Sequence, residues 1–192
     1  MTSRAQFLQR FTDIAVVDHA LPSFEFAAID APLRALFSGM LVKVGGQLGT
    51  ANTQPELQQF VQQKIAEGCQ VLSLVEGLAG SRDPGQITDP HQLADIDYTI
   101  APASIAVAEN GSVWLDSEKL ATRNSVFICQ HLIVVCPAAN IVGTLNEGMR
   151  KVDKIADNWG CFISGPSKTA DIEQALVIGA HGAMSMTVWL ID

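Results

Sequence analysis

The stretch from residue 162 to residue 191 restricts the fold more than any other part of the chain. The residues at 161–163 form a short apolar run that is typical of a buried strand. Residues 164–169 are mostly polar, and Gly165 and Pro166 interrupt the strand pattern there. The stretch therefore begins as a strand that leads into a turn.

The rest of this stretch has two hydrophobic periods. Apolar and small residues recur at i, i+3, i+4 and i+7 over residues 172–179, the spacing of one helix face, and Thr169 is placed to cap that helix. From residue 184 the period changes to two, which predicts a final strand over residues 184–190. The order strand, loop, helix, strand predicts a βαβ unit, whose two strands lie parallel in one sheet.

Helices and strands alternate elsewhere in the chain as well. Thr53 and Glu56 form a capping box that predicts a helix, and the runs at 69–75 and 131–136 are apolar enough for buried strands. His131 opens the second run, and we interpret it as a strand-entry residue rather than a catalyst.

The overall pattern predicts the fold class. Residues 37–44 are interpreted as a loop that leads into a strand, and Asn110 with Gly111 predicts a hairpin with a two-residue type I′ turn. We expect an α/β fold with a mainly parallel sheet flanked by helices, in one domain over residues 1–192. A short helix and an irregular connection at residues 1–36 are expected to pack on that domain.

The composition excludes several classes of partner. The chain has a formal net charge of −8, and its Lys and Arg residues are scattered, so we expect no binding to nucleic acid or to anionic membrane surfaces. No segment approaches the roughly 18 uninterrupted apolar residues of a membrane span, and the first residues show no signal-peptide core. We therefore expect a cytoplasmic protein.

The four cysteines are far apart and lie in or beside apolar runs. Metal and iron–sulfur sites usually need closely spaced Cys-x-x-Cys pairs, which this sequence lacks. We expect the cysteines to be small buried hydrophobes in a reduced compartment, and we predict no metal, no cluster and no other cofactor in this chain. They are Cys69, Cys129, Cys136 and Cys161.

The polar loop and the helix expected after it offer a place for an anion. Ser167, Lys168 and Thr169 would add donors and a positive charge to the unpaired N–H groups of a helix N-terminus. Asp171 and Glu173 in the first turn would already complement the helix dipole, so simple capping is the alternative. The candidate ligand-binding residues of this loop are Ser164, Gly165, Ser167, Lys168, Thr169 and Asp171.

Two further turns carry candidate catalytic side chains. The hairpin explains Asn110 and Gly111, but it does not explain Glu109, whose carboxylate can act as a nucleophile or base when desolvated and positioned. His181, followed by Gly182, lies at an expected helix end, where it can act as an acid or base or complement the helix dipole. The candidate catalytic residues are Glu109 and His181, and Asn110, Gly111 and Gly182 are candidate ligand-binding residues.

A family resemblance lies in the same segments. Residues 163–173, followed by residues 179–182, resemble the C-terminal signature of the lactate utilisation protein C family, which is built on the LUD domain. Residues 106–113 resemble the family's other glycine-centred turn. The chain differs from the family pattern at residues 110–112, where members often carry Thr-Gly-Thr, and at Ala183, where they often carry proline.

The resemblance implies a NagB/RpiA/CoA-transferase-like fold and a role in a bacterial system that oxidises L-lactate to pyruvate. In that system, partner proteins would carry the iron–sulfur clusters, and this chain would be an accessory or subunit protein. Residues 109–111 also resemble the catalytic turn of class I CoA-transferases, in which the glutamate attacks a thioester. The alternative is an independent enzyme or binder that holds an anionic carboxylate, phosphate or CoA-type ligand at residues 164–169 with Glu109 and His181.

Overall fold

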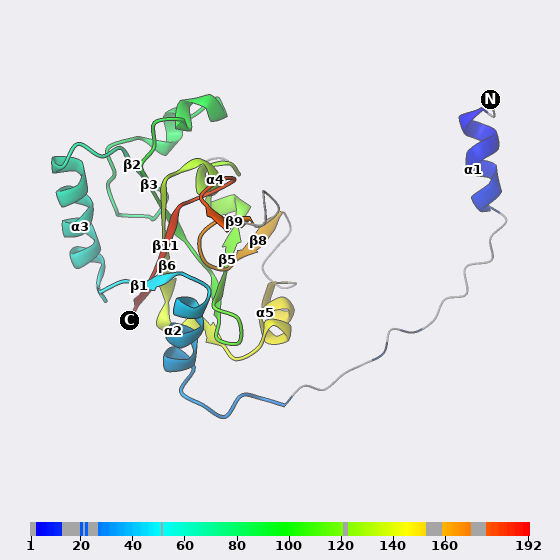
Figure 1. Cartoon of the computed structure of the whole chain (residues 1–192), viewed down its shortest axis with the longest axis horizontal. Coiled ribbons are helices and arrows are strands. Elements are labelled where there is room, and N and C mark those ends of the chain that lie inside the picture. Colours follow the sequence, from blue (N-terminus) through cyan, green and yellow to red (C-terminus); the bar gives the residue numbers. More distant parts are fainter. Residues whose placement is uncertain are drawn as a thin grey trace.

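The computed structural model of the chain describes residues 3–12, 20, 22, 27–50, 52–120, 123–152, 159–169 and 176–192. Figure 1 shows a central sheet with helix α3 on one side and a second sheet on the other. The predicted α/β fold, with a mainly parallel sheet flanked by helices, is confirmed. The α-helices are α1 (Arg4–Thr12), α2 (Leu33–Lys43), α3 (Gln54–Ala66), α4 (Ser125–Ile128) and α5 (Leu145–Val152).

The central sheet has five strands, and all of its neighbouring strands are parallel. Their order in space is β1–β11–β6–β3–β2, so the last strand in sequence lies inside the sheet. Crossovers through helices and the second sheet connect these strands, as parallel pairing requires. Their bounds are β1 (Gln47–Leu48), β2 (Val71–Ser73), β3 (Tyr98–Pro102), β6 (His131–Pro137) and β11 (Ser185–Ile191).

The second sheet has four strands in the order β7–β4–β5–β8. It contains the expected hairpin, in which β4 pairs antiparallel with β5, and β8 pairs antiparallel with β5 on the other side. A separate antiparallel pair joins β9 to β10. The bounds are β4 (Ile105–Val107), β5 (Ser112–Asp116), β7 (Ile141–Val142), β8 (Gly160–Ile163), β9 (Lys168–Thr169) and β10 (Val177–Ile178).

The two faces of the central sheet bury different cores because alternate residues of a strand point to opposite faces. On one face, Leu57 and Val61 of α3 pack with Ile100, Ile133 and Trp189. On the other face, α2 and strands of the second sheet pack against the sheet in the largest buried cluster. This cluster includes Phe37, Leu41, Leu132, Val134, Met186 and Val188.

Helix α3 begins as its sequence predicts. Glu56 N donates to the Thr53 hydroxyl, and the Glu56 carboxylate accepts from Thr53 N at 3.1 Å, which completes the capping box. Helix α2 corrects the interpretation of residues 37–44 as a loop. This helix begins after Pro32, and it buries Phe37 and Leu41, which lie about one turn apart. Its apolar period starts before residue 37, so the period extends beyond the segment that was interpreted as a loop.

The βαβ prediction for the C-terminal stretch is wrong. Strand β8 lies in the second sheet and β11 lies in the central sheet, so the two strands do not share a sheet. The predicted helix at 172–179 is contradicted at its end, where β10 pairs with β9 and Leu176 is exposed. Residues 170–175 lie outside the described residues. Thr169 belongs to β9 and pairs with Val177, so it does not cap a helix there.

The hairpin turn also differs from its prediction. Val107 pairs with Ser112, so four residues connect the strands and the turn is not the two-residue type I′ form. Gly111 has a φ of 65°, a conformation that favours glycine, and a Cβ there would lie 2.9 Å from the backbone nitrogen of Leu41. The approach of α2 to this turn therefore explains the glycine.

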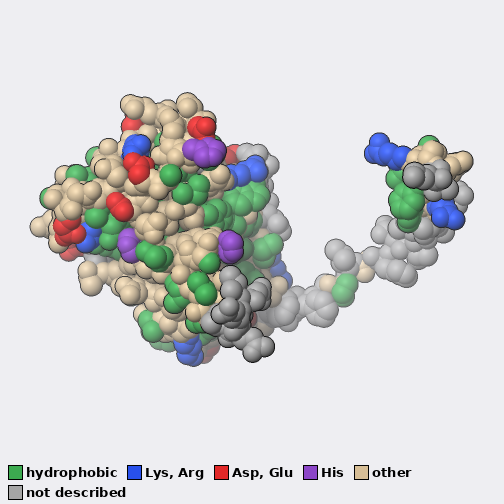
Figure 2. Space-filling model, turned by 45° about the horizontal axis from the view of Figure 1, so that its top comes forward, with side chains coloured by type: hydrophobic (Ala, Val, Ile, Leu, Met, Phe, Trp, Pro, Cys, Tyr) green, Lys and Arg blue, Asp and Glu red, His purple; other side chains and the backbone are tan. Residues whose placement is uncertain are grey.

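Helix α1 forms at the predicted place, but none of its residues is buried. Figure 1 draws it apart from the rest of the chain, and Figure 2 shows apolar side chains on its surface. Phe7 and Phe11 lie with ring centroids 5.2 Å apart, and both are more than half exposed. The packing of residues 1–36 on the domain stays a prediction.

Candidate functional site

Two of the predicted site segments lie side by side at one end of the central sheet. Ser167 N donates to the carbonyl oxygen of Ala183 at 2.9 Å, and Gly179 N donates to the carbonyl oxygen of Ser167 at 3.0 Å. The two segments line an open cavity of about 340 Å³, which we call the loop cavity. Six predicted site residues line it: Ser164, Gly165, Ser167, Lys168, His181 and Gly182.

The loop has this shape because it lies against the end of α2. Gly165 is buried and has a φ of 72°, and a Cβ at this position would overlap the carbonyl oxygen of Val44. A Cβ on Gly182 would lie 3.1 Å from Cβ of Ser167, tighter than ordinary van der Waals contact. Small residues at both positions therefore let the two segments approach.

Lys168 extends from this loop to the C-terminal end of α2. Its Nζ donates to the carbonyl oxygen of Val44, the C-cap residue of that helix. An ammonium group is favourable at a helix C-terminus because the last carbonyls carry partial negative charge. Lys168 therefore has a structural contact, and it also lines the loop cavity.

Glu109 does not line the loop cavity. Its carboxylate accepts from Leu145 N at 2.8 Å, at the first residue of α5, where a negative charge complements the helix dipole. Asn110 does not line the cavity either, but its carbonyl oxygen accepts from the hydroxyl of Ser164, which does, at 2.9 Å. The Asn110 side chain accepts from both N and Oγ of Ser112 within the turn.

The remaining predicted residues have three different outcomes. His181 is exposed on the rim of the loop cavity, while Gly111 and Thr169 do not line it. Asp171 lies outside the described residues. The structure thus brings the 164–168 loop and the 181–182 pair together, and it places the carboxylate of Glu109 at the N-terminus of α5.

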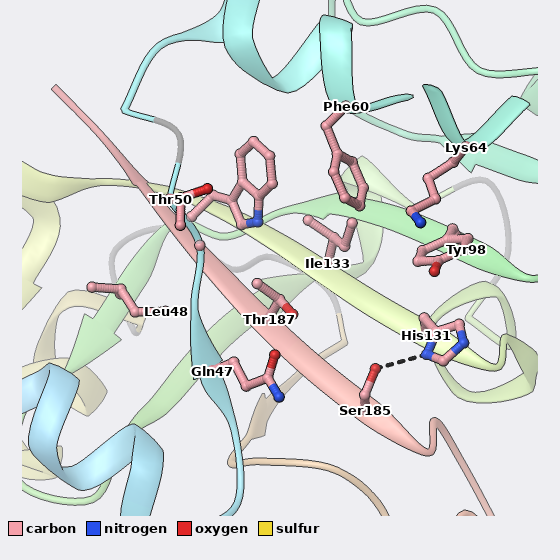
Figure 3. Close-up of a pocket in the computed structure, with 12 residues that line it drawn as sticks. Gln47, Leu48, Thr50, Phe60, Lys64, Tyr98, His131, Ile133, Ser185 and Thr187 are labelled. Carbon is pink, nitrogen blue, oxygen red and sulfur yellow. Dashed lines mark hydrogen bonds between the residues drawn. The ribbon is translucent and has the colours of Figure 1, made fainter. Parts of the chain in front are cut away.

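The sequence analysis missed a second and larger cavity, of about 430 Å³, on the α3 face of the central sheet. We call it the sheet-face cavity. Figure 3 shows Lys64, Tyr98, His131 and Ser185 gathered at one end of it, with a hydrogen bond of 2.8 Å between His131 Nδ1 and Ser185 Oγ. The sequence offered one signal for this cavity, because three of these four residues are the first residue of a strand.

Three physical findings bear on the other expectations. Cys129 and Cys136 are buried, as expected of small hydrophobes, whereas Cys69 and Cys161 are only partly buried. Burial raises the pKa of the Cys136 thiol to about 12. Within the described ranges, no helix has both the length and the apolar composition to cross a membrane. On the face drawn in Figure 2, acidic and basic side chains are interspersed and no continuous basic patch appears.

Comparison with known proteins gives one match to a protein family, the LUD domain, over residues 89–191. Relatives named "Lactate utilization protein C" include one from Shouchella clausii, 29% identical over 58% of this chain and 50% of its own length. Another, from Geobacillus thermodenitrificans, is 35% identical over 44% of this chain and 38% of its own length. The chain thus spans half or less of these two relatives.

A solved structure supports the fold. The crystal structure of a DUF162 family protein from Deinococcus radiodurans superposes with a TM-score of 0.62 at 18% identity, covering 83% of this chain and 96% of that one. At this identity the similarity concerns the fold. The family match covers more than half of the chain and includes the loop cavity, β6 and β11. The chain therefore belongs to the LUD domain family.

Proposed function

We propose that this chain is a component of a bacterial system that oxidises L-lactate to pyruvate, and that it acts beside partner proteins that carry iron–sulfur clusters. The observation that carries this proposal is the LUD domain match together with several relatives named "Lactate utilization protein C". The proposal transfers their role to a chain that spans half or less of their length.

The cysteines support the assignment of the clusters to partners. Thiolates are the usual cluster ligands, and burial raises the pKa of Cys129, Cys136 and Cys161, which keeps these thiols protonated. Among the residues that the structure describes, no three or more His, Cys, Asp or Glu side chains are grouped to hold a metal ion. The subunit proposal therefore assigns this chain a binding or assembly role.

A deletion in the native host tests the role. We expect the strain that lacks this gene to grow normally on glucose and poorly on L-lactate, and the wild-type gene to restore growth. A tagged chain purified from lactate-grown cells should bring down iron-containing proteins, measured by metal analysis and by their absorbance. Normal growth on lactate together with an iron-free, solitary chain would overturn the proposal.

A second candidate function is the binding of a small anion in the loop cavity. It is favoured by the gathering of Lys168, His181 and the Ser164 and Ser167 hydroxyls around one cavity. Lys168 supplies a positive charge, His181 an imidazole and Ser167 a hydroxyl donor, which suit a carboxylate or a phosphate, while the Ser164 hydroxyl donates to the Asn110 carbonyl oxygen. In the catalytic form of this proposal, His181 handles a proton and Glu109 leaves its position on α5 to act as nucleophile or base.

Thermal unfolding tests the loop cavity. Lactate, pyruvate, phosphate and CoA are each added to the wild type and to Lys168→Met, with Lys151→Met as a control on the exposed surface of α5. A ligand at a hundred times its Kd adds about 2.7 kcal/mol, a shift on the order of 5–10 °C for a chain of this size. A shift in wild type and control that is lost in Lys168→Met supports the site. No shift with any compound, or an equal shift in all three proteins, contradicts it.

Two substitutions test catalysis separately from binding. If the site is catalytic, Glu109→Gln and His181→Ala should abolish turnover of a bound acyl or keto-acid compound while its binding persists. Turnover that both variants retain would refute the catalytic roles of Glu109 and His181.

A further inference from the structure

We propose that the sheet-face cavity binds a small amphipathic organic acid, with its carboxylate at the Lys64–His131–Ser185 end and its apolar body against Phe60, Ile133 and Trp189. This site is distinct from the loop cavity, and the inference does not depend on the proposed role in lactate utilisation. It rests on strand register, on the aromatic wall of the cavity and on the charge of the lining.

Strand register aligns the polar end of the cavity. Ser185 of β11 is paired with His131 of β6, and His131 is paired with Tyr98 of β3, so their side chains form one row across three parallel strands. Two residues further along, on the same face, the row contains Thr187 and Ile133. The cavity therefore changes from polar to apolar along the strand direction.

The polar row is held in place by its own contacts. His131 Nδ1 lies 2.8 Å from Ser185 Oγ, and the imidazole stacks on the Tyr98 ring with centroids 4.7 Å apart. When the Ser185 hydroxyl donates to Nδ1, the neutral imidazole carries its proton on Nε2 and can donate it. His131 and Ser185 therefore form a pair that is oriented before a ligand arrives.

Two aromatic side chains form the apolar end of the cavity. Phe60 and Trp189 pack edge to face with centroids 5.2 Å apart. Trp189 is 4% exposed, and its Nε1 makes no hydrogen bond within the described part of the chain, although a buried N–H usually has an acceptor. A Cβ on Gly49 would overlap the indole, so only glycine lets β1 continue past this ring. Gly49 covers this N–H, so the indole contributes apolar ring surface to the cavity and no donor to a ligand.

The charges of the residues that line the cavity favour an anionic ligand over a cationic one. The described residues that line the cavity include Lys64 and His131 and no carboxylate, in a chain whose net charge is −8. Lys64 Nζ is 5.6 Å from the centroid of Phe60 and 5.8 Å from that of Tyr98, so it lies over the aromatic wall. Glu67 outside the cavity binds the same ammonium at 2.7 Å and competes with a ligand carboxylate. An aromatic cage for a cation would not contain an ammonium group of its own.

Binding of three matched probes tests the inference. These are 3-phenylpropionate, its neutral amide and the cationic 3-phenylpropylamine, each titrated calorimetrically into the full chain and followed by tryptophan fluorescence. We expect saturable binding of the acid, at least about tenfold weaker binding of the amide, and none of the amine, because a charge-assisted hydrogen bond is worth about 1.5–3 kcal/mol. Equal binding of acid and amide, or no saturable binding of the acid, would overturn the proposal.

Variants locate the site. Lys64→Met and His131→Gln should weaken acid binding by about tenfold or more, whereas the exposed controls Lys151→Met and His91→Gln should leave it unchanged. Glu67→Gln should tighten it by about twofold to fivefold, since it removes the competing carboxylate of an exposed ion pair. Thermal unfolding of each unliganded variant confirms that it is folded. Binding that is insensitive to Lys64→Met and His131→Gln, or weakened by Glu67→Gln, would place the acid elsewhere and refute the site.

Discussion

Replacement of Glu109 tests whether its carboxylate has a structural role or a catalytic one. The Glu109 carboxylate accepts from Leu145 N at 2.8 Å, and Glu147 accepts from Gly143 N at 2.8 Å, so two carboxylates bind N–H groups at the start of α5. The Glu109 backbone N also donates to the Gly143 carbonyl oxygen at 2.9 Å. That backbone bond holds the turn when the side chain is removed, so the substitution isolates the contribution of the carboxylate.

The expected loss in the free energy of unfolding follows from the known cost of removing a helix cap. Loss of an N-terminal helix cap costs about 0.5–2 kcal/mol, and the charge itself contributes about 0.3–1 kcal/mol at an exposed helix N-terminus. Because Glu109 is exposed, we expect Glu109→Ala to lower the free energy of unfolding by about 1 kcal/mol. Glu109→Gln keeps an acceptor and loses the charge, so it should cost about half as much. The corresponding fall in Tm for Glu109→Ala is about 2–4 °C.

Urea unfolding followed by circular dichroism provides the measurement, with Glu76→Ala as the control because Glu76 is an exposed loop carboxylate. The control should change stability by less than about 0.5 kcal/mol, and the dependence of the free energy on urea should be equal in all variants. A rise in stability on replacement of Glu109 would refute the cap. It would instead indicate a carboxylate held at a cost to stability, as catalytic groups often are.

Three further outcomes are expected. Gly160→Ala would overlap the Trp114 ring and should cost about 1–3 kcal/mol in urea unfolding, whereas Gly39→Ala meets no atom within 4 Å inside α2 and should stabilise by up to about 1 kcal/mol. Burial raises the pKa of Cys136 to about 12, above the roughly 8.5 of an unfolded thiol, so the free energy of unfolding should fall as pH rises from about 9 towards 12, and Cys136→Ala should lose less over that interval. Thr53→Ala removes the capping hydroxyl of α3 and should lower the free energy of unfolding by about 1 kcal/mol, measured by the same urea assay.

Local signals predicted the elements that local chemistry controls. The capping box of Thr53 needs only residues within one helical turn, and α3 starts there. The period of two over the last strand predicted its buried side, and Met186, Val188 and Leu190 are each at most 1% exposed. The predicted start at residue 184 was one residue early, since β11 begins at Ser185 and Met184 is 46% exposed. Such patterns depend on neighbours in sequence, and they are visible in a single chain.

Pairing between distant segments was not predictable in the same way. Strand β8 pairs with β5, and β10 pairs with β9, although the helical spacing over residues 172–179 favoured a helix. The loop cavity was anticipated in part because its residues lie within two short segments. The sheet-face cavity was missed because Tyr98, His131 and Ser185 are aligned only by the strand order β11–β6–β3.

The position of β11 sets the order in which this protein can fold during synthesis. Strand β1 pairs with β11 in the central sheet, and β11 also pairs with β6 along its whole length, from Ser185 to Ile191. Until these seven residues have left the ribosome, no strand lies between β1 and β6, and the edges of these two strands that later pair with β11 are exposed to other chains. Completion of the sheet therefore requires the closure of long loops, and a ribosome that stalls before residue 185 would leave a chain suited to chaperone binding.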